Sequence, residues 1–347
     1  MKKSVLVTGG AGYIGSHTCH QLVETGEHVV VVDNFYSGHR WAVPDQAVLV
    51  EGNAGDIELT SKLMREHDVD TVIHFAGHIV VPESVTDPLK YYRNNTQNSR
   101  NLLEACINSG VNQFVFSSTA AVYGIPKEQP ATEQTDTAPI NAYGRSKLMT
   151  EWMMQDLADR PDIDDGFRFI ALRYFNVAGA RADLTIGQAT PEATHLIKVA
   201  CQTALGLRDS VSIFGTDYPT PDGTGVRDYI HVDDLATAHL SALNYLRRGG
   251  KSTIMNCGYG QGYSVREVMR MVKKVSGVDF TIIETPRRAG DPPELIAGNE
   301  LIHKTLDWKI RYQDLEVICQ TAYEWEKKWT EMQGKGERGK ERLKIKD

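Results

Sequence analysis

The chain has 347 residues, with 45 acidic side chains, 38 basic ones and a formal charge of −7 at pH 7. Hydrophobic residues make up 41% and charged residues 24%, which is typical of a globular protein with one large domain or two smaller ones. Because a mildly acidic chain lacks the broad basic surface that phosphate backbones require, we expect no nucleic-acid partner. No apolar run is longer than a strand, so the sequence predicts no membrane span.

The cysteines are odd in number, scattered, and never spaced as CxxC. They are Cys19, Cys106, Cys201, Cys257 and Cys319. This pattern favours neither a disulfide framework nor a zinc site. We therefore expect free, buried thiols in a cytoplasmic protein, and no metal.

Strand-like and helix-like segments alternate in the first half of the chain. The expected strands are Val5–Val7, Val29–Val32, Ala47–Val50, Thr71–Phe75, Phe114–Ser117 and Arg168–Leu172. The expected helices between them include His17–Glu24, Leu59–Arg65 and Gln97–Ile107. Continuous apolar strands that alternate with helices predict an α/β fold with a doubly wound, Rossmann-type parallel sheet, covered on both faces.

A glycine-rich turn follows the first expected strand. Gly9, Gly12 and Gly15 lie where that strand passes into a helix. Without side chains they allow a tight turn, a close approach of pyrophosphate to backbone N–H groups, and close packing of helix on sheet. The positive end of the helix dipole then faces the phosphates. Glycines also occur in such turns for purely conformational reasons, but this context favours a dinucleotide site.

Further residues are expected at the carboxyl edge of the sheet, where a dinucleotide binds. Asp33 ends the second strand, and its carboxylate can accept hydrogen bonds from a ribose diol but would repel a 2′-phosphate. This favours NAD over NADP, although Asp–Asn is also a common start of a turn. Asp56–Ile57 and Phe75–Gly77 leave the third and fourth strands at the same edge.

The regular rhythm ends after about residue 176, where prolines separate shorter elements. We expect an NAD-binding domain over residues 1–175, with residues 231–257 returning to its sheet. Residues 176–330 are expected to form mainly a smaller α+β substrate domain. The tail over 331–347 is rich in Lys, Glu and Gly, and its composition predicts disorder.

Tyr143 and Lys147 lie four residues apart in YGRSK, so on a helix they share a face. A free tyrosine, with a pKa of about 10, is a poor base at neutral pH. A neighbouring ammonium and the positive nicotinamide of the oxidised cofactor would favour the phenolate, making Tyr143 a candidate general base. A hydroxyl of Ser117–Thr119, after an expected strand, could bind the same substrate oxygen. Taken alone, a Tyr/Lys pair on a helix is more often a solvated surface pair.

Six motifs occur in order along the chain: TGGAGYIGSH, DNFYSG, HFAG, SSTAAVYG, YGRSK and RYFNVAGA. In that order they resemble the extended short-chain dehydrogenase/reductase family. Two later stretches, IFGTDYPTPDGTGVRDYIHVDDLA and PRRAGD, resemble the members of this family that epimerise UDP-hexoses at C4. The similarity covers about residues 3–330, and the later stretches are the more specific.

The resemblance implies a tightly held NAD and reversible interconversion of UDP-glucose and UDP-galactose through a transient 4-keto sugar. Tyr143 would remove the 4-hydroxyl proton, Lys147 would lower the Tyr143 pKa and hold the nicotinamide ribose, and Thr119 would stand beside Tyr143. The implied cofactor contacts are Gly9, Gly12, Tyr13, Ile14, Gly15, Asp33, Asn34, Ser37, Asp56, Ile57, Phe75, Ala76, Gly77, Asn94, Ser117, Tyr143, Lys147 and Tyr174.

The implied substrate contacts are Thr119, Tyr143, Asn176, His195, Leu196, Ser212, Phe214, Arg227, Arg288, Asp291 and Leu295. The two arginines suit a diphosphate, since a guanidinium fork pairs with two phosphate oxygens, and Asp291 suits ribose hydroxyls. Without the resemblance, an Arg227–Asp228 surface ion pair and a solvated turn at Arg288 would be the simpler interpretation.

Three positions depart from the family pattern. His78–Ile79 follows HFAG where many members carry a lysine, so that cofactor contact is expected to be missing. His195 stands near a position where some members place an asparagine beside uracil, and we treat it as a weak ligand. Leu295 occupies the position that sets the room for an N-acetyl group; its intermediate size predicts a preference for glucose and galactose.

Two other functions would share the glycine turn. A nucleotide-sugar 4,6-dehydratase needs an acid/base pair, usually Asp-Glu, directly after Thr119, but this chain has Ala120–Ala121 there. A non-catalytic dinucleotide sensor would tend to lack the Tyr/Lys pair. Finally, a homodimer is expected through helices 97–107 and 143–157, which carry an apparent surplus of apolar residues: Leu102, Leu103, Leu148, Met149, Trp152 and Met153.

Overall fold

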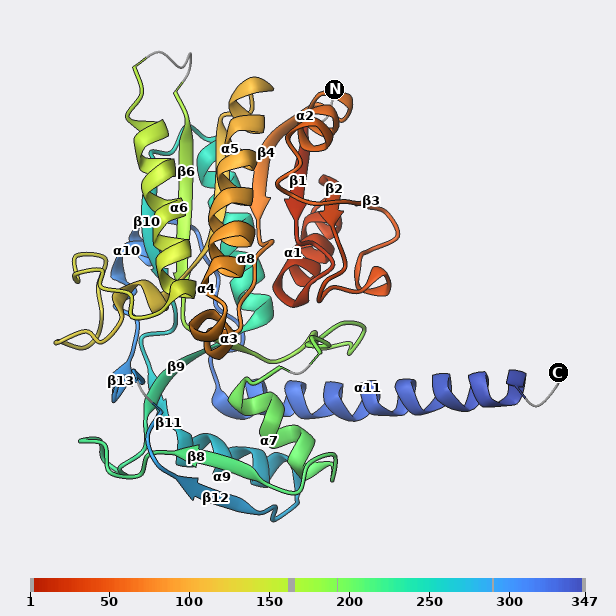
Figure 1. The fold of residues 1–347 in the computed structure, drawn as a ribbon, viewed down its shortest axis with the longest axis vertical. Coiled ribbons are helices and arrows are strands. Elements are labelled where there is room, and N and C mark those ends of the chain that lie inside the picture. Colours follow the sequence, from red (N-terminus) through yellow and green to blue (C-terminus); the bar gives the residue numbers. More distant parts are fainter. Residues whose placement is uncertain (1–2, 162–165, 192, 289, 345–347) are drawn as a thin grey trace.

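A seven-stranded parallel sheet forms the centre of the protein (Figure 1). The computed structural model describes residues 3–161, 166–191, 193–288 and 290–344. The strand order is β10-β6-β5-β4-β1-β2-β3. The strands are β1 (Ser4–Thr8), β2 (His28–Asp33), β3 (Val48–Glu51), β4 (Val69–His74), β5 (Gln113–Thr119), β6 (Arg168–Tyr174) and β10 (Thr253–Cys257). The strand order reverses between β1 and β4, as in a doubly wound sheet, so the predicted fold class is confirmed.

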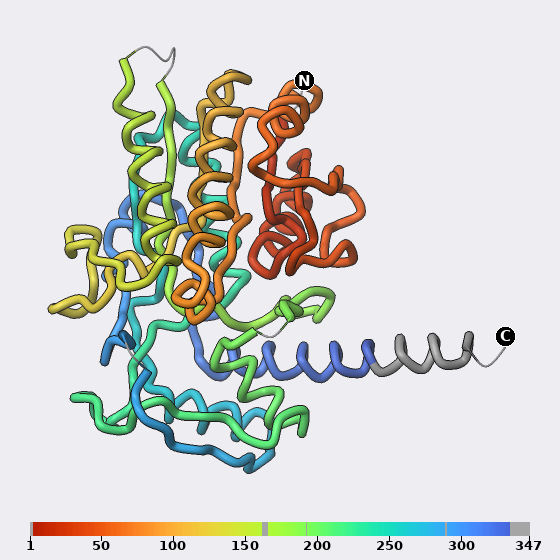
Figure 2. Tube along the Cα trace, in the orientation of Figure 1, coloured from red at the N-terminus to blue at the C-terminus, as the bar shows by residue number. Residues whose placement is uncertain are grey.

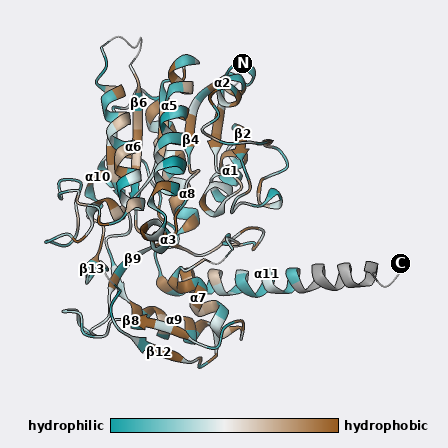
Figure 3. Cartoon of the chain, in the orientation of Figure 1, coloured by the Kyte–Doolittle hydropathy of each residue, from teal (hydrophilic) through white to brown (hydrophobic). Residues whose placement is uncertain are grey.

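Helices cover both faces of this sheet, because successive apolar residues of each strand point to opposite sides. On one face, α2 (Ile57–Glu66), α5 (Asn98–Asn108) and α6 (Ala142–Ala158) pack on a core that includes Leu6 and Phe114. On the other, α1 (Tyr13–Glu24) and α8 (Val232–Arg247) pack on a core that includes Val5, Val7 and Val115. Figure 3 shows the strands as mainly hydrophobic and the covering helices as mixed.

Residues 231–257 form α8 and β10. Helix α8 lies against α1, and β10 pairs with β6 at the edge of the sheet. After β6 the chain therefore enters the smaller part of the molecule, returns to the central sheet to form α8 and β10, and then re-enters the smaller part, as the colours of Figure 2 show.

The smaller part of the molecule contains two further sheets. One consists of β7 (Asn176–Ala178), β9 (Val226–His231), β11 (Gly262–Ser264) and β13 (Glu294–Leu295), arranged around β9. The other pairs β8 (Val211–Phe214) with β12 (Ile282–Thr285). The helices of the smaller part are α7 (Leu196–Ala204), α9 (Val265–Ser276) and α11 (Leu315–Lys344), while α10 (Glu300–Thr305) lies near β10.

Short helical turns connect the main elements. They are η1 (Arg40–Ala42), α3 (Val81–Thr86), α4 (Pro88–Tyr91), the π-helical turn η2 (Tyr92–Gln97) and η3 (Ala120–Tyr123). The helix expected over residues 97–107 therefore corresponds to α5, and the π-helical turn η2 directly precedes it. This turn brings a run of polar residues toward the carboxyl edge of the sheet.

Three sequence expectations concern the chain as a whole. All five cysteines are free and buried, as predicted. The disorder expected over residues 331–347 stays a prediction: α11 is assigned as far as Lys344, and residues 345–347 lie outside the described residues. No helix in the described part of the chain is long and apolar enough to cross a membrane.

The apolar surplus expected on α5 and α6 is smaller than the sequence suggests. Leu102, Leu103 and Leu148 are buried within the chain's own cores, whereas the Trp152 side chain is 55% exposed. Only part of that list is therefore available for a partner.

Candidate active site

The glycine turn between β1 and α1 forms a cradle that side chains would fill. Gly9 has φ +72°, and a Cβ there would lie 2.6 Å from the backbone nitrogen of Ala76. A Cβ on Gly15 would lie 2.2 Å from the carbonyl oxygen of Gly9. The turn therefore admits no larger residue at either position.

Helix α1 begins directly behind this cradle. Its N-cap, Gly12, offers no side chain to the first N–H groups of the helix, so the backbone N–H groups near Tyr13 and Ile14 can bind an anion. The phenol of Tyr13 is engaged elsewhere, since it donates a 2.6 Å hydrogen bond to the carbonyl of Gly179. Only the backbone of Tyr13 is thus suited to the predicted cofactor contact.

Asp33 holds the cradle in place from the end of β2. One carboxylate oxygen accepts from the Ala11 N–H at 2.9 Å and the other from the Phe35 N–H at 2.8 Å. Burial raises the pKa of Asp33, and these two N–H groups work against that rise. Each carboxylate oxygen keeps a second lone pair, which can accept from a ribose hydroxyl. The cradle, the uncapped helix start and Asp33 together fit a dinucleotide.

Other predicted cofactor residues have local roles. Asp56 is the N-cap of α2 and accepts from the Leu59 N–H at 3.0 Å, with Ile57 as the first helical residue. Asn34 accepts from the backbone N–H of Tyr36, and Ser37 is half-buried in the same loop. Phe75 and Ala76 both donate backbone hydrogen bonds to the carbonyl of Thr8, which places the segment 75–77 beside the glycine cradle.

A polar cavity of about 450 Å³ opens near these loops. Of the predicted residues only Asn94 lines it. The other lining residues are Tyr36, Asn53, His78, Lys90, Arg93, Gln97 and Asn98. His78 stands where a cofactor contact was expected to be missing, and none of the other lining residues was predicted from the sequence. The polar run over 93–98, which the π-helical turn and the start of α5 carry, is the signal that points to them.

The candidate catalytic side chains lie together at the carboxyl end of β5. Asn141 caps α6 by accepting from the Gly144 N–H at 2.8 Å, which fixes the first turn of the helix that carries Tyr143. A Cβ on Gly144 would lie 2.6 Å from the Ala121 carbonyl oxygen, so only glycine lets α6 approach the turn after Thr119 this closely. Thr119 accepts from the Ala121 N–H at 3.1 Å, and its own proton remains available for the phenol or for a substrate.

Lys147 is buried one helical turn after Tyr143. Its ammonium donates to the carbonyl of Ser117 at 2.9 Å and lies 4.9 Å from the centre of the Phe116 ring. A Cβ on Gly77 would lie 3.4 Å from Nζ, so the ammonium also faces the loop after β4. Burial lowers the pKa of Lys147 to about 8.

The pKa of Tyr143 depends on its burial and on its hydrogen-bond partner. Burial raises the pKa of Tyr143, and a hydrogen bond with Thr119 offsets part of that rise. The ammonium of Lys147 is directed to the Ser117 carbonyl. The expectation that this ammonium, together with the oxidised nicotinamide, favours the Tyr143 phenolate stays a prediction.

Two more predicted cofactor residues are joined to each other. The hydroxyls of Ser117 and Tyr174 are hydrogen-bonded, which connects the end of β5 to the end of β6. Burial raises the pKa of Tyr174, which stays a neutral phenol. The pair forms a wall of the site next to Tyr143.

A buried polar network supports the catalytic helix from behind. Glu151, one turn beyond Lys147, accepts from Arg173 Nε at 2.9 Å and from Arg173 Nη2 at 2.6 Å. Arg173 Nη1 donates to the Tyr123 hydroxyl at 3.0 Å, which donates to Asn256 at 2.6 Å. This network was not predicted from the sequence, since its members lie far apart along the chain.

Apart from Thr119 and Tyr143, the predicted substrate residues lie in the smaller part of the molecule. Asn176 begins β7, and its partner on β9 is Tyr229. Two residues before Tyr229 on β9, Arg227 pairs with Leu295 of β13. His195 is the N-cap residue of α7 and Leu196 its first residue.

The two arginines differ in their surroundings. Arg227 Nη2 lies 3.3 Å from a carboxylate oxygen of Asp291. Asp228 is not its partner, because the Asp228 carboxylate accepts from the backbone N–H groups of Tyr259 and Gly260. The Arg288 guanidinium lies 3.6 Å from the centre of the Phe214 ring. Ser212 lies on β8 together with Phe214. The structure thus brings Arg227, Asp291 and Leu295 to one strand edge, with Arg288 and Phe214 in mutual contact.

The geometry defines a nucleotide-cofactor enzyme, and comparison with known proteins specifies its class. The model of the NAD dependent epimerase/dehydratase family matches residues 5–258. The chain therefore belongs to this family; it is an enzyme, and its cofactor is NAD.

Its relatives are similar over nearly the whole chain. The UDP-glucose 4-epimerase of Azospirillum brasilense is 56% identical over 323 residues, which cover 93% of this chain and 92% of that protein. A UDP-glucose-4-epimerase from Stenotrophomonas maltophila, crystallised with NAD and formylated UDP-arabinopyranose, superposes with a TM-score of 0.91 at 40% identity and covers 95% of this chain and 99% of its own. The UDP-Glc/GlcNAc 4-epimerase from Campylobacter jejuni is 48% identical, with a TM-score of 0.82 over 94% of this chain and 99% of its own. Within the family, this chain thus groups with the UDP-glucose 4-epimerases, which are isomerases.

Proposed function

We propose that the protein interconverts UDP-glucose and UDP-galactose by inverting C4 of the hexose through a transient 4-keto sugar. The observation that carries this proposal is the convergence of Tyr143, Lys147 and Thr119 at the same sheet edge as the glycine cradle. Inversion at an unactivated carbon has no low-barrier direct route. A reversible oxidation solves this problem, since a planar ketone can be reduced from either face.

The positions of the three side chains support one role for each. Bound NAD would accept and return the C4 hydride and, when oxidised, would bring a positive charge that favours the Tyr143 phenolate. Tyr143 removes the proton of the 4-hydroxyl and later returns it. Thr119 donates to the phenol or to the sugar oxygen, and Lys147 holds the nicotinamide ribose.

The chain offers a place for each part of NAD. Gly9, Gly12 and Gly15 with the start of α1 would receive the pyrophosphate, and Asp33 the adenosine ribose. The polar cavity around Asn94 lies on the same loops and would receive the adenosine end.

The sugar nucleotide would be held mainly through its UDP part. Arg227 and Arg288 suit the diphosphate and Asp291 the uridine ribose, while Asn176 and Leu196 line the same region. With only the nucleotide fixed, the 4-keto sugar can swing about its bond to the diphosphate and present its other face.

The proposal is tested by incubating the enzyme with UDP-galactose and measuring UDP-glucose. Tyr143→Phe should keep NAD bound and lose most turnover, by about 100-fold or more. Unchanged turnover in that variant would remove Tyr143 from its role. Accumulation of a 4-keto product would favour a 4,6-dehydratase, which Ala120–Ala121 makes the weaker candidate. NAD binding without any turnover would favour a dinucleotide sensor.

Leu295 bears on the choice of hexose. Its side chain is half-buried on β13, opposite Arg227. We propose a preference for glucose and galactose, with poor use of the N-acetylated pair. Equal turnover of UDP-N-acetylglucosamine and UDP-glucose would contradict this preference.

The proposal also includes the oligomeric state of the protein and its location in the cell. We propose a homodimer through α5 and α6, supported by the exposed Trp152 on α6. Five free buried thiols support a cytoplasmic location. Light scattering that shows a monomer at micromolar concentration would contradict the dimer.

A further inference from the structure

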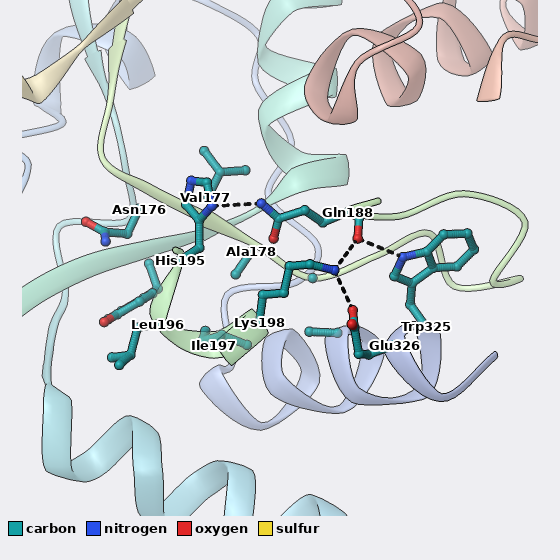
Figure 4. Close-up of a pocket in the computed structure, with 13 residues that line it drawn as sticks. Asn176, Val177, Ala178, Gln188, His195, Leu196, Ile197, Lys198, Trp325 and Glu326 are labelled. Carbon is teal, nitrogen blue, oxygen red and sulfur yellow. Dashed lines mark hydrogen bonds and ion pairs between the residues drawn. The ribbon is translucent and has the colours of Figure 1, made fainter. Parts of the chain in front are cut away.

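A small cavity lies beside the starts of β7 and α7, next to the predicted substrate residues Asn176 and Leu196 (Figure 4). Its volume of about 20 Å³ has room for a single water molecule. The cavity is therefore not a ligand site of its own. It matters because of the side chains that line it, among them Gln188 and His195.

The side chains of Gln188 and His195 are joined by one hydrogen bond. The amide nitrogen of Gln188 lies 2.8 Å from Nδ1 of His195. Because an amide N–H only donates, Nδ1 must accept, and the single proton of a neutral imidazole is then on Nε2. In Figure 4 the His195 ring lies between Gln188 and Asn176, with Nε2 on the edge turned away from Gln188.

The backbone of Gln188 is itself held firmly. Its carbonyl accepts from Lys198 Nζ at 2.8 Å and from Trp325 Nε1 at 3.2 Å. Lys198 also forms a 2.6 Å ion pair with Glu326 of α11, and both side chains are almost completely buried. The loop that carries Gln188 is thus fixed to both α7 and α11, so its amide has a defined position relative to His195.

We propose that Gln188 is a positioning residue of the sugar-nucleotide site: it fixes His195 in the neutral tautomer that presents an Nε2–H donor to the UDP part of the substrate. This inference rests on the proposed function for the identity of the ligand. It assigns to Gln188 the task of keeping His195 a donor, a task that the resemblance to the family does not give it.

The surroundings of His195 keep the ring neutral. The other titratable groups that line the cavity are Lys198 on α7, Glu326 on α11 and Tyr229 on β9. Burial, and then the charge of Lys198, lower the pKa of His195 to about 4. The donor therefore stays the same across neutral pH, while Arg227 and Arg288 supply the positive charge for the diphosphate.

The tautomer can be tested by replacing the amide with a carboxylate. In Gln188→Glu the new carboxylate accepts a hydrogen bond from Nδ1–H of His195. A neutral ring then has a lone pair on Nε2, which cannot donate to the substrate. Only the doubly protonated ring would still donate from Nε2. We expect KM for UDP-galactose to rise about 10-fold with increasing pH as the ring loses its second proton, with kcat within about 2-fold of the wild type. In Gln188→Leu either tautomer is allowed, and KM should rise about 3-fold without a new pH dependence.

A direct readout does not depend on activity. The ¹⁵N chemical shifts of His195, assigned by their absence in His195→Gln, report which ring nitrogen carries the proton. We expect a protonated Nε2 in the wild type and a protonated Nδ1 in Gln188→Glu. Gln313→Glu is the matched control, because it makes the same change at an exposed residue outside the cavity and should alter neither the shifts nor KM.

Either of two results would overturn the proposal: a proton on Nδ1 in the wild type, or a KM profile of Gln188→Glu that matches the control. If Gln188→Glu does not fold, as judged by circular dichroism, the wild-type spectrum and Gln188→Leu decide. A wild-type enzyme that does not convert UDP-galactose would contradict the proposed function instead, and the spectrum would still report the tautomer.

Discussion

The buried ion pair behind α6 allows a quantitative prediction. In Glu151→Gln one carboxylate oxygen becomes an NH₂ group that faces an Arg173 N–H, so one of the two hydrogen bonds between these side chains is replaced by a contact between two donors. The Glu151 side chain is 1% exposed and that of Arg173 is 5% exposed. Water therefore cannot compensate the guanidinium, which stays buried without its counter-charge.

We expect Glu151→Gln to lower the free energy of unfolding by about 3–5 kcal/mol, the range found when one partner of a buried pair is removed. The assay is equilibrium urea unfolding at pH 7.5 with saturating NAD, followed by circular dichroism. Since α6 carries both Tyr143 and Lys147, kcat should fall as well, while KM for UDP-galactose changes little.

A double variant separates lost charge from lost packing. Replacing both partners by apolar residues, Glu151→Leu with Arg173→Met, leaves no buried unpaired charge and should recover most of the lost stability. A loss below about 1 kcal/mol in the single variant would refute the reasoning. So would a double variant that is less stable than the single one.

Three other perturbations test separate parts of the account. Gly15→Ala places a Cβ 2.2 Å from the Gly9 carbonyl and should weaken NAD binding about 10- to 100-fold in a fluorescence titration; wild-type affinity would contradict the cradle. Arg288→Leu should raise KM for UDP-galactose about 10-fold with little change in kcat, and an unchanged KM would remove it from the substrate site. Burial lowers the folded-state pKa of four histidines to about 3 or 4: His74, His195, His231 and His239. Lowering the pH from 6 to 5 should therefore reduce the free energy of unfolding by roughly 3–4 kcal/mol, because these histidines are protonated in the unfolded state only; Asp228, whose pKa burial raises to about 6, opposes part of this loss. A stability that stays constant over this range would contradict the low pKa values of the four histidines.

The sheet could be predicted from local sequence because each strand is an apolar run and each covering helix has its own periodicity. All seven strands of the central sheet fall on or beside segments that the sequence indicated. The glycine turn was equally readable, since the steric need for glycine at positions 9 and 15 is a local property.

The electrostatic behaviour of the site could not be predicted in the same way. Spacing places Tyr143 and Lys147 on one face of α6, but it does not show that the ammonium is directed to the Ser117 carbonyl. Burial, which dominates the pKa of Tyr143, is a consequence of the whole fold.

Contacts between distant segments were also beyond the sequence. The Glu151–Arg173 pair and the Gln188–His195 bond depend on how strands and loops are assembled. Likewise, Leu102 and Leu103 were expected to be available to a partner, yet they fill the chain's own core. Periodicity gives the apolar face of a helix but not what covers it.

The most direct test of the central claim follows a single hydrogen atom. The enzyme is given UDP-galactose labelled with deuterium at C4, in ordinary water, and the UDP-glucose formed is analysed by NMR. If the C4 hydride leaves to the bound cofactor and returns to the opposite face, the product keeps its deuterium at C4. If the product carries hydrogen from the solvent at C4, hydride transfer through a resident cofactor beside Tyr143 is contradicted.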